Sequence, residues 1–206
     1  MGDEFTELLE GLATGKKVAS RGQHFVHVGV DSLPQLPKDN TDRNRTSPFA
    51  FTGNKFEFRM VGSSASISGP NIVINVIASE ALDEIATRLE KAGKNSLHKE
   101  ATAIIRDAMK KHGRIIFNGN NYSEEWIAEA KKRGLPNVRT GVEALASMAT
   151  PEAVKLFEKY KVLSAGELHS RYEIYLEHYV KHVNIEARAV VHMTKRQYLP
   201  AVIEFT

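Results

Sequence analysis

The chain has 206 residues, no cysteine, and a formal charge of +3 that results from 28 basic and 25 acidic residues. This length suffices for one domain with a buried core. The near balance of basic and acidic residues gives no general reason to expect binding to nucleic acid. The lack of cysteine excludes disulfides, thiolate metal sites and a cysteine nucleophile.

The N-terminal residues, MGDEF, are acidic and polar where a secretory signal would be basic and then apolar. No apolar run of the sequence approaches the ~20 residues that a membrane-spanning helix needs. We therefore expect a soluble, cytoplasmic protein without a membrane partner.

The first elements are predicted to be one helix, one strand and one long loop. Asp3 can cap a helix whose apolar residues recur at helical spacing, and Gly15 is the expected end of that helix. Residues 25–30 predict a short strand. Residues 32–52 include three prolines, which excludes a regular helix and indicates a long ordered loop. Loops of that length inside compact domains are usually functional or disordered.

Residues 55–59, Lys-Phe-Glu-Phe-Arg, predict a strand with one charged and one apolar face, because successive side chains of a strand point to opposite sides. The charged residues are Lys55, Glu57 and Arg59, and the apolar residues are Phe56, Phe58 and Met60. A carboxylate between two cations suits a site for a metal ion, a phosphate or a carboxylate, since Glu is a hard ligand for Mg²⁺ and Arg binds oxyanions with two hydrogen bonds. The alternative is a solvated face held by i, i+2 ion pairs, which is the commoner fate of such a pentapeptide.

From residue 69 onward the pattern predicts amphipathic helices. We expect the first from Gly69 to Gly93, the second around residues 101–113, and a third that Ser123 caps and Gly134 ends. A fourth should begin at Thr150 and Pro151. The capping-box spacing of Ser164 and Glu167 predicts the start of a fifth, which runs toward Arg188.

We expect the aromatic and histidine side chains to have structural roles and not catalytic or metal-binding ones. Trp126 is expected to anchor a core or an interface. Three tyrosines at helical spacing predict a packing stripe: Tyr172, Tyr175 and Tyr179. His178 and His182 have the i, i+4 spacing of zinc ligands but no third ligand placed by the sequence, and His24 and His27 have no acidic partner nearby, so we interpret all four as ordinary polar residues.

The stretch from Asp42 to Ser64, DRNRTSPFAFTGNKFEFRMVGSS, resembles the corresponding stretch of type III glutamine synthetases almost residue for residue. Further blocks extend the resemblance in the right order over nearly the whole chain: FNGNNYS from 117, KRGLPN from 132, TPEA from 150, SRY from 170 and VNIEAR from 183.

The resemblance implies an ATP-dependent ligase that joins ammonia to glutamate, in which ATP phosphorylates the γ-carboxylate and ammonia then displaces phosphate. It implies Mg²⁺ or Mn²⁺ as cofactor and Glu57 as a ligand of the ion nearer the ATP phosphates. Arg59 matches the arginine that holds substrate glutamate, and Arg45 matches the arginine that stabilises the transferring phosphoryl group. Lys55 stands where commoner members carry an ATP-phosphate arginine, and Ala50 stands near another such position.

For the fold, the resemblance implies an α+β, predominantly helical chain. Residues 1–68 would form part of the catalytic barrel, with its active-site loop and strand, and residues 69–206 the helical region of the same catalytic domain. The family's other metal ligands and most barrel strands lie upstream of the matched region, and complete members form homo-oligomers of stacked hexameric rings. We therefore expect the isolated chain to be inactive, and the apolar side of the strand at 56–60 to bury against the helices or another chain.

Two other functions remain open at this point. The chain could be a non-catalytic helical scaffold or assembly module, in which Trp126 and the tyrosine stripe mediate contacts. It could also be an anion-binding module with a different set of cations: Arg43, Arg45, Lys55 and Arg59.

Overall fold

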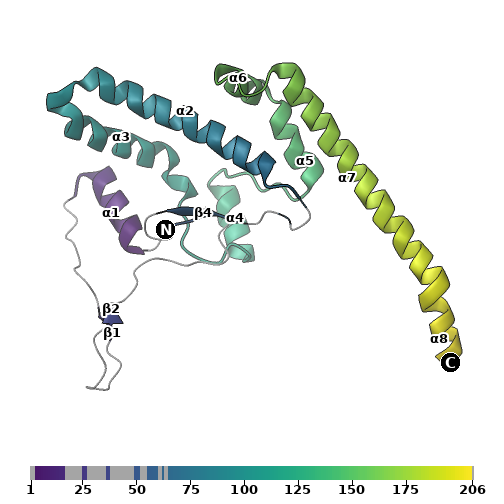
Figure 1. The fold of residues 1–206 in the computed structure, drawn as a ribbon. Helices are drawn as coiled ribbons and strands as arrows, with labels where there is room; N and C mark the ends of the chain where they lie inside the picture. The colour runs from purple at the N-terminus through teal and green to yellow at the C-terminus, as the bar shows by residue number, and fades with distance from the viewer. Residues whose placement is uncertain are drawn as a thin grey trace. The chain divides into compact units, whose positions relative to one another are not determined.

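The computed structural model describes residues 3–16, 25–26, 36–37, 49–51, 55–59, 62 and 65–205. These fall into two compact units, Met1–Asn137 and Val138–Thr206. Helices account for most of both units (Figure 1), which confirms the predicted α+β, predominantly helical fold. The predicted division of the chain between residues 68 and 69 stays a prediction.

Among its described residues, the first unit has two small antiparallel sheets of two strands each. β1 (Phe25–Val26) pairs with β2 (Leu36–Pro37), and β3 (Phe49–Phe51) pairs with β4 (Phe56–Phe58). The strand expected over residues 25–30 does begin at Phe25, and its later residues lie outside the described part. The prediction of a long loop over residues 32–52 is wrong at β2 and β3. The prolines of this stretch exclude a helix, but proline is tolerated in strands that form the edge of a sheet.

The helices of the first unit lie close to where the sequence predicts them. They are α1 (Asp3–Thr14), α2 (Ser68–Ala92), α3 (Leu97–His112) and α4 (Glu124–Lys132), with 3₁₀ turns at Lys94–Ser96 and Gly113–Ile115. Gly15, Gly93 and Gly134 follow three of these helices with φ of 74°, 72° and 68°. Because L side chains rarely adopt this left-handed region, the predicted helix ends at these glycines are confirmed.

Polar contacts tie the helices of the first unit together. Arg88 of α2 pairs with Glu100 at 2.8 Å and with Asp107 at 3.0 Å, both on α3. Hydrogen bonds to these two carboxylates raise the pKa of Arg88 above its ordinary value. α1 packs on α3, and the loop after α3 reaches α1 through Asn118, whose side-chain amide donates to the Thr6 hydroxyl at 2.8 Å.

Among its described residues, the second unit contains α5 (Gly141–Leu145), a 3₁₀ turn (Ala146–Ala149), α6 (Pro151–Lys159), α7 (Ala165–Met193), the π-helical turn η4 (Thr194–Tyr198) and α8 (Leu199–Phe205). The hydroxyl of Thr150 accepts from the backbone of Ala153, and Ser164 and Glu167 form a capping box, so both predicted helix starts are confirmed. α5 was not predicted, although Thr140 has the cap spacing and accepts from the backbone of Glu143 at 3.3 Å.

α7 is partly packed and partly exposed. Its first half contacts α5, α6 and the 3₁₀ turn that joins them, and Leu168 is completely buried there. From Glu177 to Met193 every residue is exposed, and η4 and α8 continue the same long helix to the C-terminus (Figure 1). No helix in the described part of the chain is both long enough and apolar enough to cross a membrane.

Candidate functional site

Three of the predicted site residues lie on or directly beside β4, in the hairpin that β4 forms with β3: Lys55, Glu57 and Arg59. In its register Phe49 is opposite Phe58, Ala50 opposite Glu57, and Phe51 opposite Phe56. Residues directly opposite each other in an antiparallel pair project to the same side of the sheet. The hairpin therefore has one face with Ala50 and Glu57, and a second face with four phenylalanines.

The charged face brings the three predicted side chains together. Nη2 of Arg59 donates to Oε2 of Glu57 at 2.9 Å, and Nζ of Lys55 lies 4.0 Å from Oε1 of the same carboxylate. The prediction that Lys55, Glu57 and Arg59 share one side of the strand is confirmed. An ion pair at such a partly exposed position typically stabilises a fold by only about 0–1 kcal/mol, so stability alone gives a weak reason for this arrangement.

Ala50 lies beside Glu57 on the neighbouring strand and is 3% exposed. Its methyl group offers no polar atom to the carboxylate, whereas the Glu57 side chain remains 40% exposed. The hairpin therefore presents a carboxylate that is oriented by cations of its own strand and is open to solvent.

The second face of the hairpin is an aromatic cluster. The Phe56 ring lies 5.3 Å from that of Phe49 and 5.1 Å from that of Phe51, and Phe49 lies 6.3 Å from Phe58, between centroids. Phe51 also stacks on Phe5 of α1 at 4.7 Å, which attaches the hairpin to the helices.

The helices of this chain leave Phe56 and Phe58 50% and 45% exposed, so burial of the apolar side of the strand against another chain stays a prediction. The physical reason is that a two-stranded sheet and one short helix cover only part of the aromatic face. Met60 lies outside the described residues.

The described residues alone do not form a metal centre. They contain no group of three or more His, Asp or Glu side chains that could hold an ion, and Glu57 is a single carboxylate where Mg²⁺ requires six oxygen ligands in octahedral geometry. Nε2 of His182 lies 3.0 Å from Oε1 of Glu186, and the interpretation of His178 and His182 as ordinary polar residues stays a prediction. His24 and His27 lie outside the described residues.

Arg45 and Arg43 also lie outside the described residues, so their predicted roles remain predictions. Reasoning from the sequence missed β3, and with it the position of Ala50 opposite Glu57. A signal for β3 was present, because Phe49-Ala50-Phe51 and Phe56-Glu57-Phe58 are two similar short runs separated by a Gly-Asn turn sequence, as in a hairpin.

The chain matches one family model and is similar to several named relatives. The family model described as "Glutamine synthetase C-terminal domain" matches residues 100–206. The type-3 glutamine synthetase of Dictyostelium discoideum is 42% identical over 202 residues, which cover 98% of this chain, including the hairpin, and 28% of the relative. A glutamine synthetase of Butyrivibrio fibrisolvens is 32% identical over 205 residues, and one of Bacteroides fragilis is 33% identical over 194 residues.

The family match covers more than half of the chain, and an α+β, predominantly helical fold is what the resemblance implied. The chain therefore belongs to the glutamine synthetase family, whose C-terminal domain it contains. It spans 27–29% of the length of these three relatives. The resemblance to type III glutamine synthetases noted in the sequence is confirmed.

Proposed function

We propose that this chain supplies one part of the active site of an ATP-dependent glutamate–ammonia ligase. In the proposal Glu57 contributes one oxygen ligand to Mg²⁺ or Mn²⁺, Arg59 holds substrate glutamate, Lys55 contacts the ATP phosphates, and Arg45 contacts both ATP and the transferring phosphoryl group. The observation that carries the proposal is the Glu57 carboxylate oriented by Lys55 and Arg59 on β4, in a chain of this family.

The chemistry of these side chains suits the reaction. A glutamate γ-carboxylate oxygen attacks the γ-phosphorus of ATP and the bond to the bridging oxygen of ADP breaks. Ammonia then adds to the acyl carbon, loses a proton, and phosphate leaves. Both steps place negative charge on oxygens, and positioned cations lower such barriers by electrostatic stabilisation.

Arg59 has a geometry suited to substrate binding. A guanidinium carries five N–H donors in a planar fork. The bond to Glu57 fixes the orientation of this fork and uses one of its donors at Nη2. The fork can therefore be held by Glu57 while it binds a substrate carboxylate, which would explain the i, i+2 placement of the two residues.

The isolated chain is proposed to be inactive. Its described residues provide one carboxylate at the hairpin, which is too few ligands for tight binding of a divalent cation. In the proposal the other ligands come from a complete enzyme, which is a cytoplasmic homo-oligomer. Turnover of the purified chain in a γ-glutamyl transfer assay with ADP and Mn²⁺, abolished by Glu57→Ala, would contradict this part of the proposal.

A chimera tests the site directly. The aligned segment of the Dictyostelium enzyme is replaced by this chain, and glutamine formation is measured. We expect an active chimera, in which Glu57→Gln lowers kcat/KM by about 100-fold or more, the usual cost of removing one electrostatic group from an active site. Glu84→Gln, at an exposed position on α2, is the matched control and should leave the rate unchanged.

The second candidate function is a non-catalytic scaffold, which the exposed second half of α7 favours. The same chimera separates the two candidates. A chimera that folds and assembles but makes no glutamine, or one that keeps its full rate with Glu57→Gln, would contradict the ligase proposal and support the scaffold.

A further inference from the structure

The exposed helix at the C-terminus has surface features that the ligase proposal does not use. We call residues 177–205 the C-terminal helix segment; it comprises the second half of α7, η4 and α8. Every residue from 177 to 205 is exposed except Thr194. The described contacts of η4 and α8 are with each other and with α7, whereas α5 and α6 pack on the first half of α7, where the buried and half-buried residues lie.

One side of this segment is an apolar stripe. Successive turns of α7 add an apolar residue three or four positions on, and Ala187 is followed at these two intervals by a pair of valines, which places the residues on one face of the helix: Val180, Val183, Ala187, Val190 and Val191. Val190 is 60% exposed and Val180 is 54% exposed. Monomeric proteins seldom leave a continuous apolar stripe of this length in water, so we interpret it as a contact surface.

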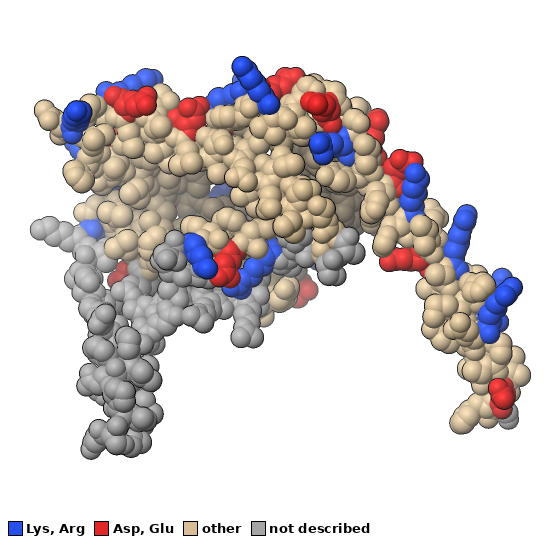
Figure 2. All heavy atoms as spheres, viewed as in Figure 1, with Lys and Arg blue, Asp and Glu red and all other residues tan. Residues whose placement is uncertain are grey.

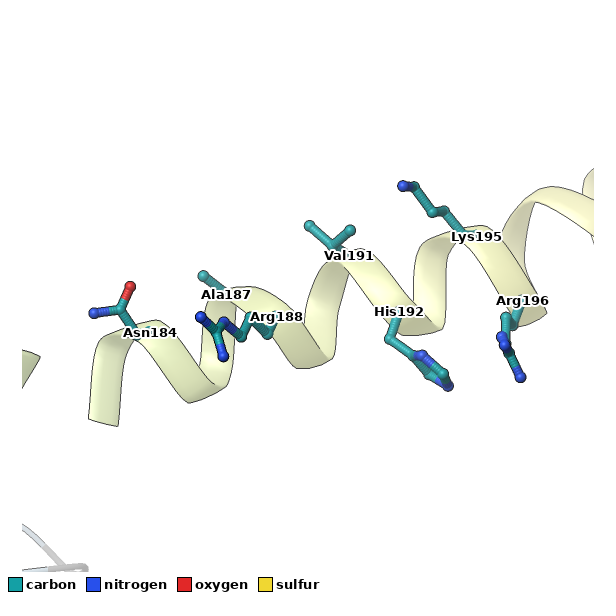
Figure 3. A pocket seen from close by; sticks show the side chains of 7 residues that line it. All are labelled: Asn184, Ala187, Arg188, Val191, His192, Lys195 and Arg196. Carbon is teal, nitrogen blue, oxygen red and sulfur yellow. The ribbon is translucent and has the colours of Figure 1, made fainter. Parts of the chain in front are cut away.

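Cations flank the stripe. Figure 3 shows His192 and Arg196 pointing to one side of the helix and Lys195 to the other side, where Val191 also lies, while the Arg188 side chain lies across the ribbon. Together with Asn184 and Ala187 these residues line a shallow, open depression. Lysine and arginine side chains stand out along this part of the helix in the space-filling view (Figure 2).

These cations lie in a stretch of the sequence without acidic residues. Residues 187–203 contain Arg188, Lys195 and Arg196 but no Asp or Glu. The preceding turns differ, because there Lys181 pairs with Glu177 at 2.6 Å and His182 with Glu186 at 3.0 Å. The charge is thus locally balanced up to Glu186 and uncompensated beyond it.

We infer that the C-terminal helix segment is a docking site for an acidic amphipathic helix of a partner protein, which packs its apolar side on the valine stripe and sets Asp and Glu side chains against Arg188, Lys195 and Arg196. Valine and alanine side chains allow two helices to approach to about 8–10 Å. Opposite charges beside the stripe then select the partner and its register.

Other occupants fit this surface less well. A symmetric pair of two copies would bring the same segments together and place the cations of residues 188–196 against each other. A nucleic acid would match the cations and leave the valines in water. A membrane surface would match both features, but helices that lie in an interface favour bulky Trp, Phe and Leu side chains on the apolar side, where this stripe has mainly valine and alanine.

The test uses the 206-residue chain and two labelled synthetic peptides of about four heptads with the same apolar residues, one flanked by Glu and the other by Lys. Fluorescence anisotropy gives the affinity of each peptide. We expect the Glu-flanked peptide to bind at least tenfold more tightly than the Lys-flanked one, and to weaken as salt rises. The triple variant R188E/K195E/R196E should reverse this preference.

Two further variants separate specific docking from general charge attraction. K91E/K94E/K99E changes the same number of exposed cations in the first unit and should leave binding of the Glu-flanked peptide unchanged. V183S/V191S should weaken that binding at least tenfold, because purely electrostatic attraction would not depend on the stripe. Circular dichroism checks that each variant keeps its helices.

Several results would overturn the inference. The proposed docking site is contradicted if neither peptide binds or if both bind equally. It is also contradicted if K91E/K94E/K99E changes peptide affinity as much as R188E/K195E/R196E does. Binding to vesicles of phosphatidylserine and phosphatidylcholine without binding to the Glu-flanked peptide would identify a membrane surface as the occupant. Dimerisation by light scattering that V183S/V191S abolishes would identify a second copy.

Discussion

The rings of Phe117 and Trp126 stack with their centroids 3.8 Å apart and their planes 22° apart. The guanidinium of Arg133 lies 5.5 Å from the centre of the Trp126 ring, and its Nη1 donates to the carbonyl of Ile116 at 2.8 Å. α4 and the segment before it are thus held together by an aromatic pair and by one arginine that contacts both. Trp126 packs within its own unit, as its predicted role as an anchor requires.

Trp126→Ala is expected to destabilise the chain, because it removes the stack on Phe117 and the contact with Arg133. A loss of about 2–4 kcal/mol in the free energy of unfolding is typical when a packed aromatic side chain is truncated. Urea unfolding measures the change. Tyr122→Ala, at a side chain that is 65% exposed four residues earlier, should cost less than about 0.5 kcal/mol. Equal losses in the two variants would show that the stack contributes nothing specific.

The sequence predicts the helices well where a single residue determines an end. Gly93 and Gly134 have positive φ, and the capping box of Ser164 and Glu167 consists of residues three apart. These signals are local, so the chain itself carries them. The charged face of β4 is also local, since strand alternation alone places Glu57 beside Arg59.

The features that the sequence did not reveal depend on contacts between distant segments. The bond from Arg133 to the carbonyl of Ile116 joins residues 17 apart, and no spacing rule indicates it. Phe51 is covered because α1 brings Phe5 to it from the start of the chain, whereas Phe56 stays half exposed for lack of a further covering element in the described part. Burial on a short sheet is set by its neighbours, so alternation predicts which face is apolar but not how much of it is buried.

Glu167 should make the stability of the second unit depend on pH. Hydrogen bonds from the backbone and the hydroxyl of Ser164 lower the pKa of Glu167 below its ordinary value of 4.5. A carboxyl whose pKa is lowered in the folded state adds stability above its unfolded pKa and loses it as the pH falls through the folded pKa. Glu167→Gln should therefore unfold at a lower temperature than the native chain at pH 7, and the difference should shrink below pH 4.5.

Thermal unfolding followed by circular dichroism between pH 7 and pH 3 measures this difference. Glu84→Gln, at an exposed carboxylate in the first unit, serves as the control and should shift the midpoint little at either pH. A difference between Glu167→Gln and the native chain that stays constant across the range would contradict the role of the ionised carboxylate in the cap.

Gly134→Ala should destabilise the end of α4. The backbone at Gly134 has a φ of +68°, and a methyl group there would also lie 3.4 Å from Nη1 of Arg114. A non-glycine residue in the left-handed region typically costs about 1–3 kcal/mol. Gly141→Ala is the opposite case, since its methyl group meets nothing within 4 Å and Gly141 begins α5, so this variant should be neutral or should stabilise by up to about 1 kcal/mol. Chemical denaturation of the two variants measures both changes, and equal effects would rule out backbone strain as the cause.

Arg59 offers the clearest separation of function from stability at the hairpin. Its ion pair with Glu57 is partly exposed, so Arg59→Lys should change the free energy of unfolding by less than about 1 kcal/mol. Lysine keeps the charge but lacks the planar fork that binds a carboxylate with two parallel hydrogen bonds. In the active chimera we therefore expect Arg59→Lys to raise the KM for glutamate about tenfold or more, as the loss of a charge-assisted hydrogen bond implies, and to leave the KM for ATP nearly unchanged.

Steady-state kinetics with each substrate varied in turn measures both constants. Lys55→Arg is the matched control on the same face of the hairpin, and it should leave the KM for glutamate unchanged. If Arg59→Lys raises the KM for ATP more than the KM for glutamate, Arg59 binds the nucleotide and not the amino acid.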